Sequence, residues 1–148
     1  MVSRLSVRPA RASDIDFILE IERASFGRDA YDRKLFAEYA HKCGGLFLVA
    51  STGTKLVGYA ITCTHLSRAE LVSIAVHPQH RGRGAASVLM DSTLRRLRRR
   101  HIARFTLMVK VSNHSALAFY EKYGFRKLRR VPRYYEDASD GFLFVRLL

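Results

Sequence analysis

The 148-residue sequence predicts a mixed α/β fold whose central sheet contains both parallel and antiparallel strand pairs. Short β-prone runs alternate with segments of helical periodicity, in the order β-αα-ββ-β-α-β-α-β-β. Hydrophobic residues make up 48% of the chain, which is enough to build a folded core. No linker, internal repeat or low-complexity tract interrupts the pattern, so we expect a single domain over residues 1–148.

The N-terminal part of the chain predicts a strand, two helices and a β-hairpin. LSVRPA is a short strand ended by Pro9, and Ser13 is placed as the N-cap of a helix with acidic residues in its first turn. YDRKLFAEYAHKCGG predicts a second helix that Gly44–Gly45 closes. LFLVAS and KLVGYAITCTHL, joined by the turn TGT, predict the two strands of the hairpin.

The remainder of the chain predicts alternating strands and helices. ELVSIAV is an apolar strand ended by His77–Pro78, and residues 85–101 predict a helix with Leu89 and Leu97 facing inward and arginines facing outward. RFTLMVKV is a strand, and SNHSALAFYEKYGF predicts a capped helix with Gly124 at its end. Residues 126–148 predict a strand, a loop and a final strand.

The net charge of +13 arises in residues 41–148, because residues 1–40 hold equal numbers of basic and acidic side chains. Such a field attracts polyanions, which include nucleic acid, the ribosome and phosphorylated cofactors. The basic segments RRLRRRH and RKLRRVPR are compatible with a solvated face or with a nucleic-acid patch. The helical spacing of the first segment favours a solvated face, and weak ribosome or nucleic-acid association stays open as a secondary property.

The two cysteines, Cys43 and Cys63, show no metal-ligand spacing, so we expect reduced thiols and no metal site. The first residues lack the apolar segment of a signal peptide, and no apolar run approaches membrane-spanning length. The sequence therefore predicts a soluble cytoplasmic protein. Its oligomeric state, monomer or homodimer, is left open.

The segment HPQHRGRGAAS, residues 77–87, joins a predicted strand to a predicted helix through a glycine-rich turn. Successive backbone N–H groups at such a junction point at one spot, and the helix dipole adds partial positive charge. Gly82 and Gly84 allow the backbone to approach an anion closely, while Arg81 and Arg83 add donors for phosphate. The spacing matches neither the Walker loop nor the dinucleotide fingerprint. The segment alone therefore leaves two interpretations open, an anion site and an ordinary tight turn.

Two motifs in the right order make the chain resemble the GNAT superfamily of acetyl-CoA-dependent N-acetyltransferases over nearly its whole length. The family signature R/Q-x-x-G-x-G/A is matched by residues 81–86, and ELVSIAVHP resembles the splayed fourth strand of the family. SNHSALAFYEKYGF is similar to the family helix N-x-x-A-x-x-x-Y-x-x-x-G-F. YDRKLF and RRVPRYY resemble the RimI-type protein N-terminal acetyltransferases. The resemblance implies a mostly antiparallel sheet of six to seven strands, about four helices, and a splayed strand pair that forms the CoA cleft.

The resemblance also implies a binding site for acetyl-CoA. The CoA pyrophosphate would be held by the amides of the glycine-rich turn, namely Arg81, Gly82, Arg83, Gly84, Ala85 and Ala86. Ile74, Ala75 and Val76 would pair with the pantetheine arm, and the Val76 N–H would polarise the thioester carbonyl. Asn113 would contact the cofactor from the start of the following helix; the alternative for Asn113 is a simple N-cap.

Acetyl transfer requires a proton donor for the leaving thiolate and a proton acceptor for the amine. Tyr120 occupies the tyrosine position of the family and is the candidate acid, with a core aromatic as the alternative. RimI-type enzymes carry a glutamate base where this chain has Met108, and methionine does not accept protons. Glu70, in AELVSIAV, resembles the glutamate base of histone-type GNAT enzymes; the alternatives are a solvated surface residue and water as the base.

In the family, the loop between the first two helices and the last strand pair frame the acceptor. The resemblance thus implies Phe26, Tyr31, Tyr134 and Tyr135 as acceptor contacts, with packed surface aromatics as the alternative. We expect a protein or peptide N-terminal α-amine as the acceptor, since its pKa of about 7.7–8.0 lies far below the lysine value of about 10.4. A small-molecule amine is the close alternative. A non-catalytic CoA-binding or nucleic-acid-binding module is the alternative of a different class.

Overall fold

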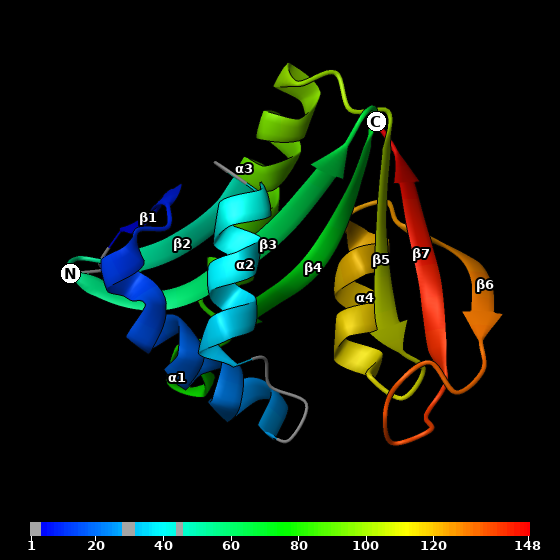
Figure 1. Cartoon of the computed structure of the whole chain (residues 1–148), viewed down its shortest axis with the longest axis horizontal. Coiled ribbons are helices and arrows are strands. Elements are labelled where there is room, and N and C mark those ends of the chain that lie inside the picture. Colours follow the sequence, from blue (N-terminus) through cyan, green and yellow to red (C-terminus); the bar gives the residue numbers. More distant parts are fainter. Residues whose placement is uncertain (1–3, 28–31, 44–45) are drawn as a thin grey trace. The chain divides into compact units, whose positions relative to one another are not determined.

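The computed structural model describes residues 4–27, 32–43 and 46–148, and its elements follow the predicted order (Figure 1). The strands are β1 (Leu5–Pro9), β2 (Phe47–Thr52), β3 (Lys55–His65), β4 (Arg68–Val76), β5 (Arg104–Lys110), β6 (Arg126–Val131) and β7 (Gly141–Leu147). The helices are α1 (Ile15–Phe26), α2 (Arg33–Cys43), α3 (Ala85–Arg99) and α4 (His114–Lys122). Short 3-10 turns, η1 (Ala12–Asp14) and η4 (Pro78–His80), precede α1 and α3.

The strands of the described residues form one seven-stranded, mostly antiparallel sheet in the order β1-β2-β3-β4-β5-β7-β6. The contacts of the chain divide into two compact units. The first unit comprises Met1–Cys63 and Val72–Arg100, and the second unit comprises Thr64–Leu71 and His101–Leu148. The expectation of a single domain over residues 1–148 stays a prediction, and the two units are described one at a time.

In the first unit, β2 pairs antiparallel with both β1 and β3, which confirms the predicted hairpin. Successive β2 residues point to opposite faces of the sheet and enter different hydrophobic clusters. Phe47 and Val49 pack with α1 and α2, in a cluster that includes Ile18, Leu19, Ile21 and Phe36. Leu48 and Ala50 pack with α3, in a cluster that includes Ala85 and Leu89. Helices therefore cover both faces of this part of the sheet.

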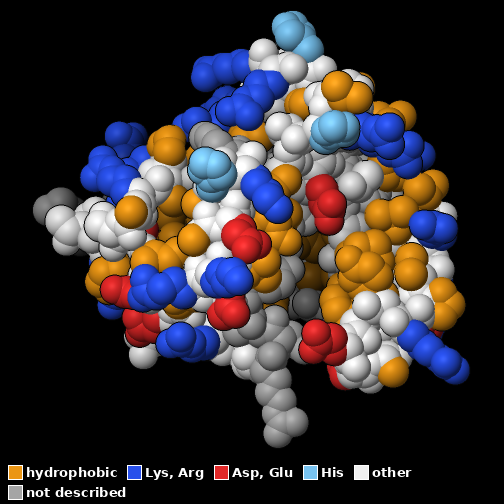
Figure 2. Space-filling model, viewed as in Figure 1, with side chains coloured by type: hydrophobic (Ala, Val, Ile, Leu, Met, Phe, Trp, Pro, Cys, Tyr) orange, Lys and Arg blue, Asp and Glu red, His pale blue; other side chains and the backbone are white. Residues whose placement is uncertain are grey.

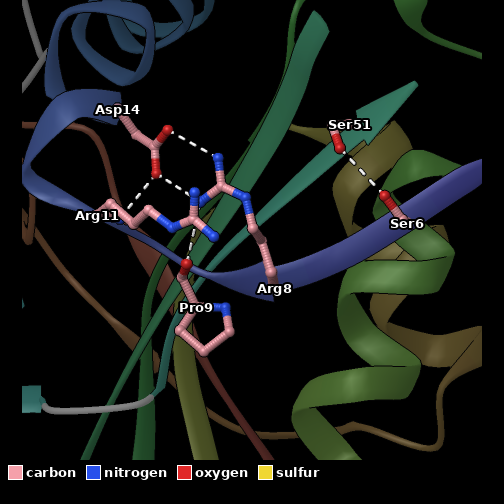
Figure 3. A network of polar contacts seen from close by, with 6 residues as sticks. All are labelled: Ser6, Arg8, Pro9, Arg11, Asp14 and Ser51. Carbon is pink, nitrogen blue, oxygen red and sulfur yellow. Dashed lines mark hydrogen bonds and ion pairs between the residues drawn. The ribbon is translucent and has the colours of Figure 1, made fainter. Parts of the chain in front are cut away.

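The prediction that Ser13 caps α1 is wrong, because Ser13 lies within η1 and the N-cap position of α1 is held by Asp14, whose side chain bonds residues ahead of η1 (Figure 3). The Asp14 carboxylate accepts two hydrogen bonds from the Arg8 guanidinium, of 2.8 and 2.9 Å, and one from the Arg11 N–H, of 2.7 Å. Arg8, mainly through its hydrogen bonds, holds the pKa of the Asp14 carboxyl below its usual range. Serine is a favoured cap residue, whereas here Asp14 takes the N-cap position and pairs with Arg8 of β1.

In the second unit, the start of β4 pairs in parallel with β5 over four residue pairs, from Arg68↔Arg104 to Leu71↔Leu107. The whole of β5 pairs antiparallel with β7, and β7 pairs in turn with β6. The core of this unit contains Phe105, Leu107, Phe125 and Phe144, all nearly inaccessible to solvent. α4 adds Tyr120, whose ring meets Phe125 edge-on at 5.8 Å. β6 is exposed along most of its length and carries four basic residues.

The expectation of reduced cysteines is contradicted for Cys63, which is disulfide-bonded. The side chain of Cys43 lies outside the described residues. Spacing along the chain carries no information about this bond, because disulfide pairing depends on which β-carbons the fold brings together.

The arginines of α3 form the solvated face of an amphipathic helix, as their spacing predicted. Leu97 is fully buried, while Arg95, Arg98 and Arg99 are exposed. Figure 2 shows Lys and Arg side chains spread over the face that it presents, with Asp and Glu side chains among them. None of the described helices is long and apolar enough to cross a membrane.

Candidate functional site

The glycine-rich turn of the first unit has the geometry of an anion cradle. Gly82 and Gly84 adopt φ angles of +77° and +89°, which side chains with a Cβ rarely occupy. A Cβ on Gly82 would meet no described heavy atom within 4 Å, so the space above this backbone is open. Gly84 is the N-cap of α3 and supplies no side-chain cap, which leaves the first N–H groups of the helix available. The turn therefore fits a phosphate group.

The surroundings of this turn are electropositive. The pKa of the His80 imidazole is lowered by burial and, to a lesser extent, by Lys55, Arg83 and His77. Its Nε2 atom is buried and has no hydrogen-bond partner among the described residues. The Arg83 side chain is exposed on the same turn. A field of this sign favours a negatively charged ligand.

The two arginines of the turn differ in their partners. The Arg81 Nε donates to the Val76 carbonyl at 3.1 Å, and its Nη2 donates to the Ser25 hydroxyl at 3.2 Å. Arg83 makes no hydrogen bond to the described residues. Sequence reasoning assigned both guanidinium groups to phosphate and missed the partners of Arg81, because Ser25 lies far away along the chain.

Ile74, Ala75 and Val76 are the last three residues of the strand β4, which ends shortly before η4. They follow Ser73, whose hydroxyl lies 3.0 Å from the Tyr59 hydroxyl and donates to Glu22 at 3.4 Å. Tyr59 also donates a hydrogen bond to Glu22, and both side chains are almost completely buried. This network attaches α1 to β3 and β4 immediately before the three predicted cofactor residues.

A glycine that sequence analysis did not single out lies against the same stretch of β4. A Cβ on Gly58 would approach the Ala75 carbonyl to 2.9 Å and the Val76 Cγ2 to 3.3 Å. The first distance is shorter than real Cβ contacts, and the atom it meets belongs to the backbone. Gly58 therefore lets β3 pack closely against the segment that is predicted to bind the cofactor.

Tyr120, the candidate acid, is buried in the second unit, with 9% of its side chain exposed. Burial raises the pKa of its hydroxyl above the usual tyrosine range, and Tyr135 raises it further. The group is therefore protonated throughout the neutral range, as a proton donor must be. Its ring packs edge-on against Phe119 and Phe125, so it is also a core aromatic.

Met108 lies in β5, beside the tyrosines of the β6–β7 loop. A Cβ on Gly141 would come within 2.8 Å of the Met108 Cε, 3.3 Å of Tyr135 and 3.4 Å of Tyr134. These three side chains therefore surround one glycine, which no sequence motif indicated. Tyr135 also makes a cation–π contact with Lys110, whose Nζ lies 5.1 Å from the centre of the tyrosine ring.

The other predicted residues occupy separate positions. Glu70 is exposed in β4, where its Cα is paired with that of Thr106. Asn113 caps α4 and accepts a hydrogen bond from the Ala116 N–H at 3.3 Å, which matches its alternative interpretation. Phe26 ends α1 in the first unit and is 39% exposed. Tyr31 lies outside the described residues.

Comparison with known families supports the predicted resemblance. Residues 15–125 match the family model described as "Acetyltransferase (GNAT) family". An N-alpha-acetyltransferase of Saccharolobus solfataricus is 31% identical over 97% of this chain and 93% of its own length. A putative [ribosomal protein bS18]-alanine N-acetyltransferase of Bacillus subtilis is 30% identical over 98% of this chain and 96% of its own length.

A solved structure supports the fold. The crystal structure of Ard1 from Thermoplasma volcanium has a TM-score of 0.93 with 26% identity and covers 97% of each chain. The match to the family model spans more than half of the chain, including the glycine-rich turn and Tyr120. The chain is therefore an N-acetyltransferase of the acetyltransferase (GNAT) family.

Proposed function

We propose that the protein transfers the acetyl group of acetyl-CoA to the N-terminal α-amine of a protein or peptide. The open glycine cradle at the start of α3 carries the proposal, within a chain that matches N-alpha-acetyltransferases over nearly their whole length. Several solved relatives of the same fold support the choice of cofactor. These include an Arabidopsis thaliana NAA60 described as bound to acetyl-CoA, with a TM-score of 0.88 at 18% identity.

The described residues fit the phosphate groups of this cofactor. Gly82 leaves open space above the backbone, a Cβ on Gly84 would meet only the Leu5 Cδ1, at 4.0 Å, and the positive charges around His80 favour an anion. We assign the pyrophosphate to the amides of residues 81–86 and the pantetheine arm to Ile74, Ala75 and Val76. Asn113 remains a proposed cofactor contact, although its side chain is engaged as a helix cap.

Acetyl-CoA supplies the acetyl group as a thioester. The Val76 N–H would donate a hydrogen bond to the thioester oxygen and stabilise the negative charge that grows there. The neutral α-amine of the acceptor forms the new C–N bond as the C–S bond breaks. The Tyr120 hydroxyl would give its proton to the departing sulfur, and burial, which raises its pKa, keeps it protonated at neutral pH.

As the C–N bond forms, the acceptor nitrogen must also lose a proton. We assign it to Glu70, directly or through water, because Glu70 is exposed and carries a carboxylate in the second unit. Met108 does not serve as a base, and its Cε packs beside Gly141. An α-amine needs little assistance to lose its proton at neutral pH. A water molecule between the amine and the Glu70 carboxylate is therefore a sufficient proton acceptor.

We assign acceptor recognition to Phe26, Tyr31, Tyr134 and Tyr135. Tyr134 is 48% exposed, and its ring meets Tyr135 edge-on at 4.9 Å. A tyrosine pair offers apolar faces and hydroxyl tips, which suit an extended peptide. Phe26 presents a partly exposed ring at the end of α1.

The proposal is tested with acetyl-CoA and three acceptors: a peptide with a free N-terminus, the same peptide blocked at its N-terminus but containing lysine, and a set of small amines. We expect acetyl transfer to the free N-terminus, located by mass spectrometry, and none to the blocked peptide. Turnover of small amines alone would favour the small-molecule alternative. Calorimetric binding of acetyl-CoA without any turnover would favour a non-catalytic module, and absence of binding would reject the proposal.

We also propose that the enzyme acts in the cytoplasm, where its exposed arginines attract polyanions weakly. Arg95, Arg98 and Arg99 on α3 and the basic residues of β6 support this association. Co-sedimentation with ribosomes should decline steeply between about 50 and 200 mM salt, because phosphate contacts release counterions. Co-sedimentation that is absent at low salt would contradict the association and leave the enzymatic proposal intact.

A further inference from the structure

The side chain of Arg81 joins three segments of the first unit. Its Nε donates to the Val76 carbonyl at the end of β4, and its Nη2 donates to the Ser25 hydroxyl in the last turn of α1. Arg81 itself begins the glycine-rich turn, immediately after η4. α1 also packs against η4. One guanidinium group therefore connects the end of α1, the end of β4 and the cofactor turn.

The geometry of these bonds determines which task the guanidinium performs. A guanidinium has five N–H donors in a rigid fork, and two of them are used here by partners from different segments. The Val76 bond is partly buried, and Val76 itself is 9% exposed. Arg81 and Arg83 are both exposed, but of the two only Arg81 makes side-chain hydrogen bonds to the described residues.

We propose that the Arg81 side chain is a positioning residue for the acceptor, which it serves by attaching the end of α1 to the cofactor strand through Ser25. The inference rests on the proposed function, since Val76 and Phe26 are there assigned to the thioester and the acceptor. Only the Arg81 amide then serves the cofactor directly. Neither the family signature nor the spacing of the turn assigns a role to Ser25.

The attachment acts through the residue next to Ser25. Phe26 is the last residue of α1, and its ring is 39% exposed. The following Gly27 adopts a φ of +53° and donates its N–H to the Arg23 carbonyl, which ends the helix. Without the bond to Arg81, this last turn loses one attachment to the cofactor turn and frays more readily. The acceptor surface then loses a fixed position relative to Val76.

The experiment measures the acetyl-CoA Kd by calorimetry, the acceptor KM and kcat with a peptide substrate, and the thermal midpoint of each variant. Ser25→Ala should raise the acceptor KM by about 3- to 10-fold, the effect of losing one exposed hydrogen bond to a charged group. The acetyl-CoA Kd should change by less than about 2-fold. Ser25→Thr keeps the hydroxyl and should restore the KM.

Arg81→Lys keeps the charge and the backbone amide but loses the fork that reaches two partners. It should raise the acceptor KM to a similar extent as Ser25→Ala. The double variant should raise the acceptor KM by no more than about 10-fold. Both substitutions break the same interaction, so their effects are not additive. Multiplicative effects would show that Ser25 and Arg81 act independently and would overturn the proposal.

Two matched controls lie on the same elements. Arg83→Gln removes the neighbouring guanidinium and should weaken acetyl-CoA binding without changing the acceptor KM. Arg23→Gln removes an exposed arginine from α1 and should change neither quantity. If Arg81→Lys instead weakens acetyl-CoA and Ser25→Ala has no effect, then Arg81 is a phosphate ligand and the proposal fails. A rise of both Kd and KM together with a fall of the thermal midpoint in both variants would indicate general destabilisation and would equally overturn it.

Amide hydrogen exchange separates this inference from the proposed function. In the protein without ligand, Ser25→Ala and Arg81→Lys should both accelerate exchange in residues 22–27, whereas Arg23→Gln and Arg83→Gln should not. This measurement requires no turnover and no acetyl-CoA. Unchanged exchange in both variants would reject the attachment even if the enzyme acetylates peptides. Accelerated exchange in a protein that binds no acetyl-CoA would support the attachment and reject the function.

Discussion

The two units of the molecule recognise their proposed ligands by different means. In the first unit, open backbone carries recognition: Gly82 and Gly84 expose amides, and Gly58 allows β3 to lie against the Ala75 carbonyl. In the second unit, side chains are proposed to carry the chemistry, with Tyr120 as the proton donor and Met108 at the position where RimI-type enzymes have a glutamate. The proposed backbone recognition depends on glycines at particular spacings, whereas the proposed side-chain chemistry depends on groups that can donate or accept a proton.

The largest expected effect tests the second unit. Tyr120→Phe should lower kcat by about 10- to 1000-fold, since the leaving sulfur loses its proton donor. The acetyl-CoA Kd, measured by calorimetry, should stay nearly constant because Tyr120 is not among the proposed contacts of the pyrophosphate or the pantetheine arm. Since burial raises the pKa of this hydroxyl, the wild-type kcat should show no loss of the acid up to at least about pH 10, the ordinary tyrosine value. Unchanged turnover would remove Tyr120 from the mechanism.

The next effect tests the backbone of the first unit. Gly58→Ala should lower the free energy of unfolding by about 1–3 kcal/mol, because its Cβ has to displace the Ala75 carbonyl. It should also weaken acetyl-CoA binding, measured by calorimetry, since Ala75 is a proposed pantetheine contact.

Gly53→Ala is the matched control for Gly58→Ala. Gly53 has a φ of +62°, but a Cβ there meets no described atom within 4 Å. Its substitution should cost about 1 kcal/mol through backbone strain alone and leave acetyl-CoA affinity unchanged. An equal loss of affinity in both variants would show that Gly58 affects binding only through overall stability.

A third prediction concerns the Arg8–Asp14 ion pair ahead of α1 in the first unit. Asp14→Asn should lower the free energy of unfolding by about 1–3 kcal/mol at pH 7, because it breaks the paired hydrogen bonds from Arg8. The folded pKa of Asp14 is depressed, so its contribution is complete above the unfolded value of about 3.9 and disappears as pH falls through the folded pKa. Urea titrations at pH 7 and pH 2.5 measure the difference. A gap that persists unchanged at pH 2.5 would contradict the assignment.

The smallest expected effect concerns the base. Glu70→Gln should leave kcat within about 10-fold of wild type at alkaline pH and shift the pH–rate profile toward more alkaline conditions. The profile is recorded with a peptide of free N-terminus. An identical profile would show that water alone accepts the proton. In either case the acetyl-CoA Kd should not change, which again distinguishes cofactor binding from the chemical step.

Much of the fold follows from patterns of short range. The hairpin of β2 and β3, the arginine face of α3 and the Asn113 cap were predictable, since each depends on residues a few positions apart. Ser13 was misassigned, because the competing cap Asp14 is selected by Arg8 on a different element. The disulfide of Cys63 was missed for the same reason. Tyr120 was identified by a family motif, but its raised pKa depends on packing with Phe125 and on the proximity of Tyr135.

The sequence by itself determined the order of the elements, the family, and the glycine turn, because turn glycines and helical periods act on neighbouring residues. Tertiary structure decided the partners of long side chains. It directed one arginine of that turn, Arg81, to Ser25 and Val76, and gave the side chain of Arg83 no hydrogen-bond partner among the described residues. It also placed Gly58 under Ala75 and gathered Met108, Tyr134 and Tyr135 around Gly141. Such contacts join residues that are distant along the chain, and only the packing of folded elements brings their atoms together.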